Sequence, residues 1–367
     1  MEQYTSFDEY LIQGEPDKRH KAENWQIAIG LQAVDGLKPS AYLIETAQKH
    51  IEGELTIEEV KKRIDAYYET EEGRKQAEDH TDEADKVASN IADLLAEDAF
   101  TFSPGQYALI HRRLFTGIIK HAGEYRTVNI SKREWVLDGD SVSYTPYYLI
   151  SDTLEYEFQQ ERGYKTKGEN NEAIVHHLAS FVSRIWQIHP FVEGNTRTTA
   201  IFTIKYLHKL GFHKVNNDAF KLHSWYFRNA LVRANYNNHE HGVTETTALL
   251  ERFFDNLLFD AKHKLKNRYC HVYWENQNDQ NSATVNATVN ATVNATVNAT
   301  VNATEKAVLT LIGENCLITY DEMATSLHKD RTTIYRAIKK LTERGLLTRQ
   351  GSDKSGQWVI INNDDNK

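Results

Sequence analysis

A tetrapeptide repeat divides this chain and sets the first limit on what it can fold into. The unit Ala-Thr-Val-Asn occurs five times in succession over residues 283–302, after a polar stretch that is poor in helix formers. Solenoid repeats need about 20–50 residues to build a unit that stacks, so this short period matches none of them. Because such a segment has no face to bury, we interpret residues 263–304 as a linker. We therefore expect folded domains on either side of it.

The composition of those domains favours helices. Apolar residues make up 40% of the 367, which is enough to build buried cores. Only 18 glycines and 5 prolines are present, and this favours long helices over a strand-rich sandwich. Two cysteines exclude a disulfide scaffold and a cysteine-rich zinc module. The sequence contains no signal peptide and no apolar run of membrane-spanning length, so we expect a cytoplasmic protein without a membrane partner.

Two regions before the linker have helical patterns. Residues 1–75 are charged and helical in spacing, and Thr56 with Glu59 three positions later forms a capping box. Residues 87–262 hold a longer series of helices. The predicted fold class is therefore mainly α.

One segment interrupts the second series. Residues 127–146 carry β-branched residues on both sides of Asp138-Gly139-Asp140, a pattern that predicts a β-hairpin. A lone hairpin cannot stabilise itself, so it must lie on the helical body as a flap. Its edge could stay a bare surface feature, or it could receive another polypeptide by strand addition.

A nine-residue polar loop joins two strongly apolar helices in this body. Residues 172–188 form the first helix by their apolar stripe, and Pro190 ends it. Residues 196–210 form the second helix, which Gly211 closes. The intervening loop, residues 189–197, therefore meets the N-terminus of a buried helix.

The loop contains the residue types that handle phosphate. His189 can take a proton near neutral pH, and Glu193 is a hard oxygen ligand suited to Mg²⁺. Arg197 can fork onto phosphate oxygens. Free backbone amides at the helix start form an anion nest, which we assign to Gly194, Asn195 and Thr196. The set predicts a phosphate-transfer site; the alternative is a capped helix with a chance histidine.

The loop sequence HPFVEGNTR resembles the signature of the Fic (filamentation induced by cAMP) family, His-x-Phe-x-(Asp/Glu)-Gly-Asn-Gly-Arg-x-x-Arg. The segment that ends at Gly123 and Arg126 is similar to the family's first core helix. Residues 227–235 are similar to its late helix beside the adenine. The resemblance spans about residues 95–260 and implies that residues 87–262 are a Fic catalytic domain, with the flap where the family positions its target.

This resemblance implies a transferase that moves AMP from ATP to a Ser, Thr or Tyr hydroxyl of a target protein docked at the flap. His189 would deprotonate that hydroxyl, and Glu193 would hold Mg²⁺ on the phosphates. Asn195 and the nest would bind the phosphates, and Arg197 would stabilise their charge. Asn235 would lie near the nucleoside.

Two positions depart from the family pattern. Thr196 replaces a glycine, and Ala200 replaces the second arginine, which in the family grips the γ-phosphate and pairs with an inhibitory glutamate. The resemblance therefore implies AMP transfer, but these two positions leave the donor nucleotide and the transferred group open. Another nucleotide donor, phosphate transfer, or a DNA-binding regulator whose Fic-like body only senses nucleotide stays open.

The N-terminal region resembles the small helical antitoxin-like module of some Fic proteins. The nearest equivalent of the family's inhibitory motif is Leu31 to Gly36, in which Asp35 takes the place of the glutamate. Since the second arginine is absent, the sequence favours Asp35 as a helix-end residue over a regulatory contact.

Residues 305–363 resemble a winged helix-turn-helix domain in their order of helices and final hairpin. Residues 329–349 hold seven basic and two acidic side chains, within a chain whose formal net charge is −9. This local basic helix predicts DNA binding; the alternative is a solvated face or a protein contact. The predicted DNA-facing residues are Arg331, Thr333, Tyr335, Arg336 and Lys339. No heptad pattern is present, and a homo-oligomer stays open.

Overall fold

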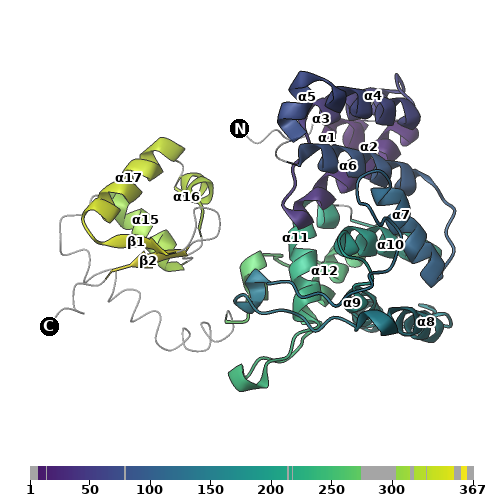
Figure 1. Cartoon of the computed structure of the whole chain (residues 1–367). Coiled ribbons are helices and arrows are strands. Elements are labelled where there is room, and N and C mark those ends of the chain that lie inside the picture. Colours follow the sequence, from purple (N-terminus) through teal and green to yellow (C-terminus); the bar gives the residue numbers. More distant parts are fainter. Residues whose placement is uncertain are drawn as a thin grey trace. The chain divides into compact units, whose positions relative to one another are not determined.

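The computed structural model consists of two compact units, Met1–Trp274 and Glu275–Lys367 (Figure 1). The structure describes residues 7–13, 15–77, 80–212, 215–216, 218–273, 303–314, 318–327, 329–350 and 357–361. The tetrapeptide repeat lies outside these residues. No helix in the described ranges is long and apolar enough to cross a membrane.

The predicted N-terminal module and the helical body share one hydrophobic core. Ser40 and Thr56 cap two of the N-terminal helices, and Thr56 forms the predicted capping box with Glu59. The N-terminal elements are α1 (Asp8–Gln13), α2 (Pro16–Gly30), the 3-10 helix η1 (Leu31–Asp35), α3 (Ala41–Glu52), α4 (Ile57–Glu69), α5 (Glu71–Ala77) and α6 (Thr81–Ala96).

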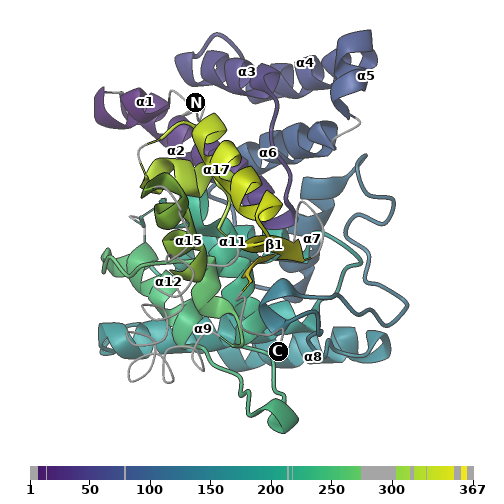
Figure 2. The ribbon, with the colours of Figure 1, turned by 90° about the vertical axis from the view of Figure 1, so that its left-hand side faces the viewer.

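The body is built around helix α10 (Asn195–Lys209), whose residues are buried from Asn195 to Leu207. Figure 2 shows α3–α5 at one end of the unit and α8 and α9 at the other. The remaining body helices are α7 (Pro104–Phe115), α8 (Ile150–Glu161), α9 (Asn171–Ile188), α11 (Asp218–Arg233) and α12 (Ala248–Phe259). Short 3-10 helices are η2 (Trp135–Leu137), η3 (Tyr147–Leu149), η4 (His239–His241) and η5 (Asn267–Cys270).

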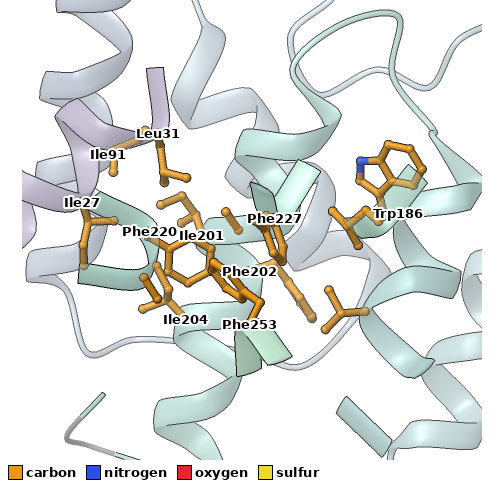
Figure 3. Close-up of a cluster of buried hydrophobic side chains, with 14 of the residues drawn as sticks. Ile27, Leu31, Ile91, Trp186, Ile201, Phe202, Ile204, Phe220, Phe227 and Phe253 are labelled. Carbon is orange, nitrogen blue, oxygen red and sulfur yellow. The ribbon is translucent and has the colours of Figure 1, made fainter. Parts of the chain in front are cut away.

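Figure 3 shows how one cluster of buried side chains joins the N-terminal helices to the body. Ile27 of α2, Leu31 of η1 and Ile91 of α6 lie beside Ile201 and Phe202 of α10. An apolar core that continues from one region into the other makes the two fold as one unit. Residues 263–273, which we expected in the linker, also belong to this unit because Leu265, Cys270 and Val272 are buried in its core.

The prediction of a β-hairpin at residues 127–146 is wrong. The paired strands found among the described residues are β1 (Leu347–Gln350) and β2 (Gln357–Ile360), both in the second unit. The predicted turn does form, since the Glu134 amide donates to the Asp140 carbonyl over 2.8 Å. Within this turn, the neighbouring residues Val136 and Leu137 of η2 are both buried. A strand would send neighbouring side chains to opposite faces, so it could not bury both in the same core.

The second unit has the helix order of a winged helix. Its helices are α15 (Ala303–Glu314), α16 (Tyr320–Ser326) and α17 (Arg331–Glu343), followed by the antiparallel pair β1–β2. Thr319 caps α16 in a capping box with Glu322. The Trp358 indole donates to the Ile318 carbonyl over 3.1 Å and so ties the wing to this segment.

The junction between α2 and α11 has no room for a side chain at Gly30. A Cβ there would lie 2.5 Å from the Lys221 carbonyl oxygen, and the Ser224 hydroxyl donates to the Gly30 carbonyl over 2.7 Å. We expect Gly30→Ala to lower the free energy of unfolding by about 1–3 kcal/mol, as overpacking against backbone does. Urea unfolding followed by circular dichroism measures this. Gly105→Ala is the matched control, since the nearest atom to its Cβ would be 3.8 Å away. Equal unfolding midpoints for the two variants would contradict the close approach.

Candidate active site

His189 ends helix α9 in a left-handed backbone conformation, with φ of 49°. The side chain is buried, and its Nδ1 lies 3.3 Å from the Trp186 carbonyl oxygen. A ring nitrogen that faces a carbonyl carries the proton, which leaves the lone pair on Nε2. His189 Nε2 is buried and has no hydrogen-bond partner in the described part of the chain. The base predicted from the sequence is therefore oriented with one nitrogen held and the other available.

Burial lowers the pKa of His189 well below its ordinary value, and the nearby positive charge of Lys132 lowers it further. The imidazole is thus neutral near pH 7 and can accept a proton. Two aromatic rings enclose it. The Tyr144 ring centroid lies 4.1 Å from that of His189, and the Trp186 ring meets it edge-on at 5.1 Å.

A buried arginine fastens the histidine loop to the flap. Arg126 Nε donates to the His189 carbonyl over 2.8 Å, and its backbone amide donates to the Pro190 carbonyl over 2.8 Å. The same guanidinium donates to the carbonyls of Val128 and Thr145, one on each arm of the flap. From the sequence, Arg126 is only the end of a segment that resembles the family. In the structure its guanidinium binds two flap carbonyls, which are therefore not available for hydrogen bonds between paired strands.

A second histidine, which sequence reasoning missed, holds the other side of the loop. His111 Nδ1 accepts the Gly123 amide over 2.8 Å, so Nε2 carries the proton and donates to the Glu193 carbonyl over 3.1 Å. The ring stacks on Phe191 with centroids 3.7 Å apart, and burial lowers the pKa of His111 to about 4. His111 is therefore a neutral structural support.

Gly194 starts helix α10 and shapes the nest. Its φ is 72°, and a Cβ would lie 2.4 Å from the Phe115 ring, so only glycine fits here. The next three amides belong to the first turn, where a helix supplies no acceptor of its own. They leave an anion-binding helix N-terminus beside the histidine loop.

The side chains of the neighbouring predicted ligands are already engaged. The Asn195 amide exchanges two hydrogen bonds with the Phe191 backbone, at 2.8 and 3.0 Å. Thr196 Oγ1 accepts from the Trp186 indole over 3.0 Å, which explains the hydroxyl at this position. These two residues can offer a phosphate their backbone amides. Asn235 Nδ2 donates to the carbonyls of Leu231 and Ser183, so the side chain closes α11 onto α9.

Arg197 is held by the N-terminal helices. Its Nε lies 2.8 Å from Asp35 Oδ2, and its Nη2 lies 2.7 Å from Glu83 Oε1. Nη1 donates to Gln32 Oε1 over 3.2 Å, and the guanidinium sits 4.8 Å from the Phe115 ring centroid. Asp35 is the last residue of η1, as the sequence favoured, and η1 also brings its carboxylate to Arg197, although the second arginine is absent. Glu83 and Gln32 were missed, since nothing local distinguishes them from other polar helix residues.

Glu193 is exposed on the loop, where its carboxylate is free to meet solvent or a ligand. Magnesium in phosphate sites is held by one or two carboxylates together with substrate phosphates. A single exposed carboxylate next to a phosphate nest fits that pattern. No cluster of three or more metal-binding side chains occurs in the described ranges.

Helix α17 of the second unit buries its apolar stripe and exposes the basic side chains predicted to face DNA. Arg331, Arg336 and Lys339 are exposed, and Tyr335 is 54% exposed. Thr333 differs, because its hydroxyl donates to the Asp330 carboxylate over 2.7 Å and so closes the N-terminal cap.

Comparisons with known proteins identify a family for each of two parts of the chain. Residues 101–207 match the Fic/DOC family, and residues 301–348 match the winged helix-turn-helix DNA-binding family. A relative described as "Probable protein adenylyltransferase y4lH" from Sinorhizobium fredii is 26% identical over 129 residues, which is 35% of this chain and 62% of the relative. The chain thus spans somewhat less than two thirds of that protein.

Two solved structures are similar. The N-terminal Fic domain of the effector protein Bep8 from Bartonella sp. 1-1C is 19% identical with a TM-score of 0.39, over 53% of this chain and 90% of that one. The N-terminal Fic domain of an effector from Bartonella sp. AR 15-3 is 20% identical with a TM-score of 0.39, over 51% and 84%. The chain therefore contains a Fic/DOC family domain over residues 101–207, followed by a C-terminal winged helix-turn-helix domain.

Proposed function

We propose that this protein transfers AMP from ATP to a Ser, Thr or Tyr hydroxyl of a target protein. The observation that carries the proposal is the His189 imidazole, which is neutral, oriented through Nδ1, and available at Nε2. It stands next to a helix N-terminus that can bind phosphate. The Fic/DOC match and the name of the Sinorhizobium relative, a probable protein adenylyltransferase, support the same reaction class.

In the proposed reaction the residues act mainly by position and charge. His189 Nε2 takes the proton of the target hydroxyl as its oxygen bonds to the α-phosphorus of ATP. The bond from that phosphorus to the bridging oxygen breaks, and pyrophosphate leaves. The amides that follow Gly194 hold the phosphate oxygens. Glu193 would hold Mg²⁺, which offsets the charge of the phosphates.

The target would dock along the flap, residues 127–146. Arg126 ties both flap arms to the His189 backbone, so a polypeptide lying on the flap has a fixed relation to the base. The flap is not a strand, and it therefore offers backbone groups and side chains without a regular ladder edge.

Labelling with ATP tests this reaction and separates it from phosphate transfer. The assay uses the Asp35→Asn variant, because Asp35 pairs with Arg197 in the structure. This variant is incubated with a lysate, Mg²⁺ and ATP labelled at either the α- or the γ-phosphate. We expect protein label from α-labelled ATP only, and a loss of about 100-fold or more in His189→Ala, as removal of a general base causes. His176→Ala, an exposed histidine of the same helix, is the control.

Two outcomes of this labelling would contradict AMP transfer. Label from γ-labelled ATP alone would replace AMP transfer by phosphate transfer. If no nucleotide labels protein while DNA binding is retained, the result would favour a nucleotide-sensing regulator and rule out the transferase function.

We also propose that Asp35 and Glu83 keep the enzyme inactive. Both carboxylates form ion pairs with the Arg197 guanidinium, which therefore cannot bind phosphate while these pairs remain in place. Phosphate oxygens compete for the same N–H groups, because guanidinium binds either anion in the same forked geometry. Activation would then require the turn η1 to release Arg197.

We expect the double variant Asp35→Asn, Glu83→Gln to raise the rate of labelling by about tenfold, which corresponds to about 1.4 kcal/mol of activation free energy. Asp65→Asn with Glu45→Gln is the control, since it removes the same two charges from the N-terminal helices, at ion pairs with Lys86 and Lys49. Initial rates at saturating ATP give the comparison. Equal rates in the double variant and the unaltered protein would reject the inhibitory role.

A second function, DNA binding, is favoured by the basic exposed face of α17 and by the winged helix-turn-helix match. Arg336 is exposed, and Lys339 and Arg331 are exposed with loose ion pairs to Glu343 and Asp321, so all three side chains can turn to the phosphates of a duplex. Such contacts add affinity that falls with salt, because each one releases counterions.

We expect Arg336→Ala with Lys339→Ala to lower the slope of log affinity against log salt by roughly two. Fluorescence anisotropy with a labelled random-sequence duplex measures it on the full chain. Lys62→Ala with Arg63→Ala removes the same charge from exposed positions of the first unit and should leave the slope unchanged. A slope shared by both double variants and the unaltered protein would rule out α17 as the DNA-binding helix.

A further inference from the structure

A pocket of about 470 Å³ opens in the first unit at the C-terminal end of α10. Its lining is drawn from three segments, which are residues 101–102 before α7, residues 161–167 at and beyond the end of α8, and residues 206–210. Because an α-helix rises 1.5 Å per residue, Tyr206 lies about 18 Å along α10 from Gly194. The pocket is therefore separate from the candidate active site, and its volume is typical of a small-molecule site.

The acidic side chain of this pocket is already held within the protein. Among the described residues that line the pocket, the one acid is Glu161, which like Tyr206 is 3% exposed. The Tyr206 hydroxyl donates to Glu161 Oε1 over 2.5 Å, and His177 Nε2 lies 3.0 and 2.8 Å from the two carboxylate oxygens. A buried carboxylate with these hydrogen-bond partners needs no cation from the pocket.

Four cationic side chains line the same pocket, those of Arg162, Lys165, Lys167 and Lys209. Within the part of the chain that the structure describes, no carboxylate forms an ion pair with any of them. Lys209 Nζ lies 5.7 Å from the ring centroid of Phe102, which also lines the pocket, so this ammonium group stands over an aromatic wall. Like charges gathered in this way repel one another, and a bound anion would relieve that repulsion.

Three aromatic side chains of the lining are fixed by their neighbours. The rings of Phe102 and Tyr206 pack with centroids 4.7 Å apart, and Tyr164 stacks on His177 with centroids 3.4 Å apart. The Tyr164 hydroxyl is buried and has no hydrogen-bond partner among the described residues, so the wall holds a donor that they leave unused. Rings held in place beside cations suit a ligand that has a flat ring and a negative charge.

We propose that this pocket binds a small aromatic phosphate monoester, with its ring against the aromatic side chains and its phosphate among the four cations. The positive charges exceed what a single carboxylate would neutralise, whereas a phosphate monoester carries about −1.5 to −2 at pH 7. Arg162 can fork onto two phosphate oxygens, and the lysines bind phosphate as point charges. The inference does not rest on the proposed transferase function, because the pocket shares no residue with the catalytic loop.

Three probes separate the ring from the charge. Naphthyl phosphate carries both, naphthol carries the ring, and inorganic phosphate carries the charge. Their affinities for the full chain are measured by calorimetry at one ionic strength, since salt screens exposed charges. We expect Lys165→Met with Lys209→Met to weaken naphthyl phosphate about tenfold and to leave naphthol unchanged. Lys62→Met with Lys266→Met removes the same charge from exposed positions outside the pocket and should bind as the unaltered protein does.

The contrary results are distinct. Equal affinity of the two double variants for naphthyl phosphate would overturn the inference, and this is the result expected if the probe binds only at the helix N-terminus of the active site. Naphthol or inorganic phosphate that binds the unaltered protein as tightly as naphthyl phosphate would also overturn it. So would an unaltered protein that binds none of the three probes.

Lysine labelling shows where an aromatic phosphate binds. The aldehyde of pyridoxal phosphate condenses with a lysine amine with loss of water, and borohydride reduces the resulting imine to a stable amine. Peptide mass spectrometry then identifies the labelled lysines. We expect Lys165, Lys167 or Lys209 to be labelled first, and naphthyl phosphate to protect them. Label spread equally over these lysines, Lys62 and Lys266 would contradict a site in this pocket.

Discussion

The buried guanidinium of Arg197 at the N-terminus of α10 is the interaction on which the arrangement of the first unit depends. A positive charge at this end of a helix is opposed by the helix dipole, and burial adds a desolvation cost. Asp35 and Glu83 offset both, and they come from the N-terminal helices. The charge therefore connects the two regions at the site, in addition to the Ser224–Gly30 hydrogen bond and the Lys221–Asp8 ion pair elsewhere between them. Because the Asp35 side chain is 37% exposed, solvent screens that contact, and it can be exchanged for another anion.

The loop before α10 is held so that one atom remains available. Arg126 and His111 bind its carbonyls from opposite sides, and the Asn195 side chain closes it internally. Thr196 fixes Trp186, whose carbonyl orients His189 through Nδ1. These contacts fix the loop backbone, and among the described residues they leave His189 Nε2 without a hydrogen-bond partner. A buried acceptor kept free in this way costs stability, and the proton-accepting role that we propose for His189 would account for that cost.

The flap obtains its position from charged side chains instead of strand pairing. Arg126 holds its two arms, and the pair between Glu134 and Arg228 holds its turn. The turn residues near Asp138 were predictable because their backbone preferences are local. The absence of strand pairing was not predictable. The Arg126 guanidinium binds a carbonyl on each arm of the flap, and both Val136 and Leu137 are buried in the core.

Patterns among residues close in the sequence determine much of this structure. The apolar stripe of α9, the capping box at Thr56 and the polar loop from His189 to Arg197 follow from residues within a few positions of one another, so the sequence alone predicts them. The same holds for the buried stripe of α17. Only the tertiary structure decided which groups surround that loop. Glu83 lies 114 residues before Arg197, and Gln32 lies 165 before it. Pairing between such distant polar side chains leaves no periodic signal, because it depends on how the packed core brings their helices together.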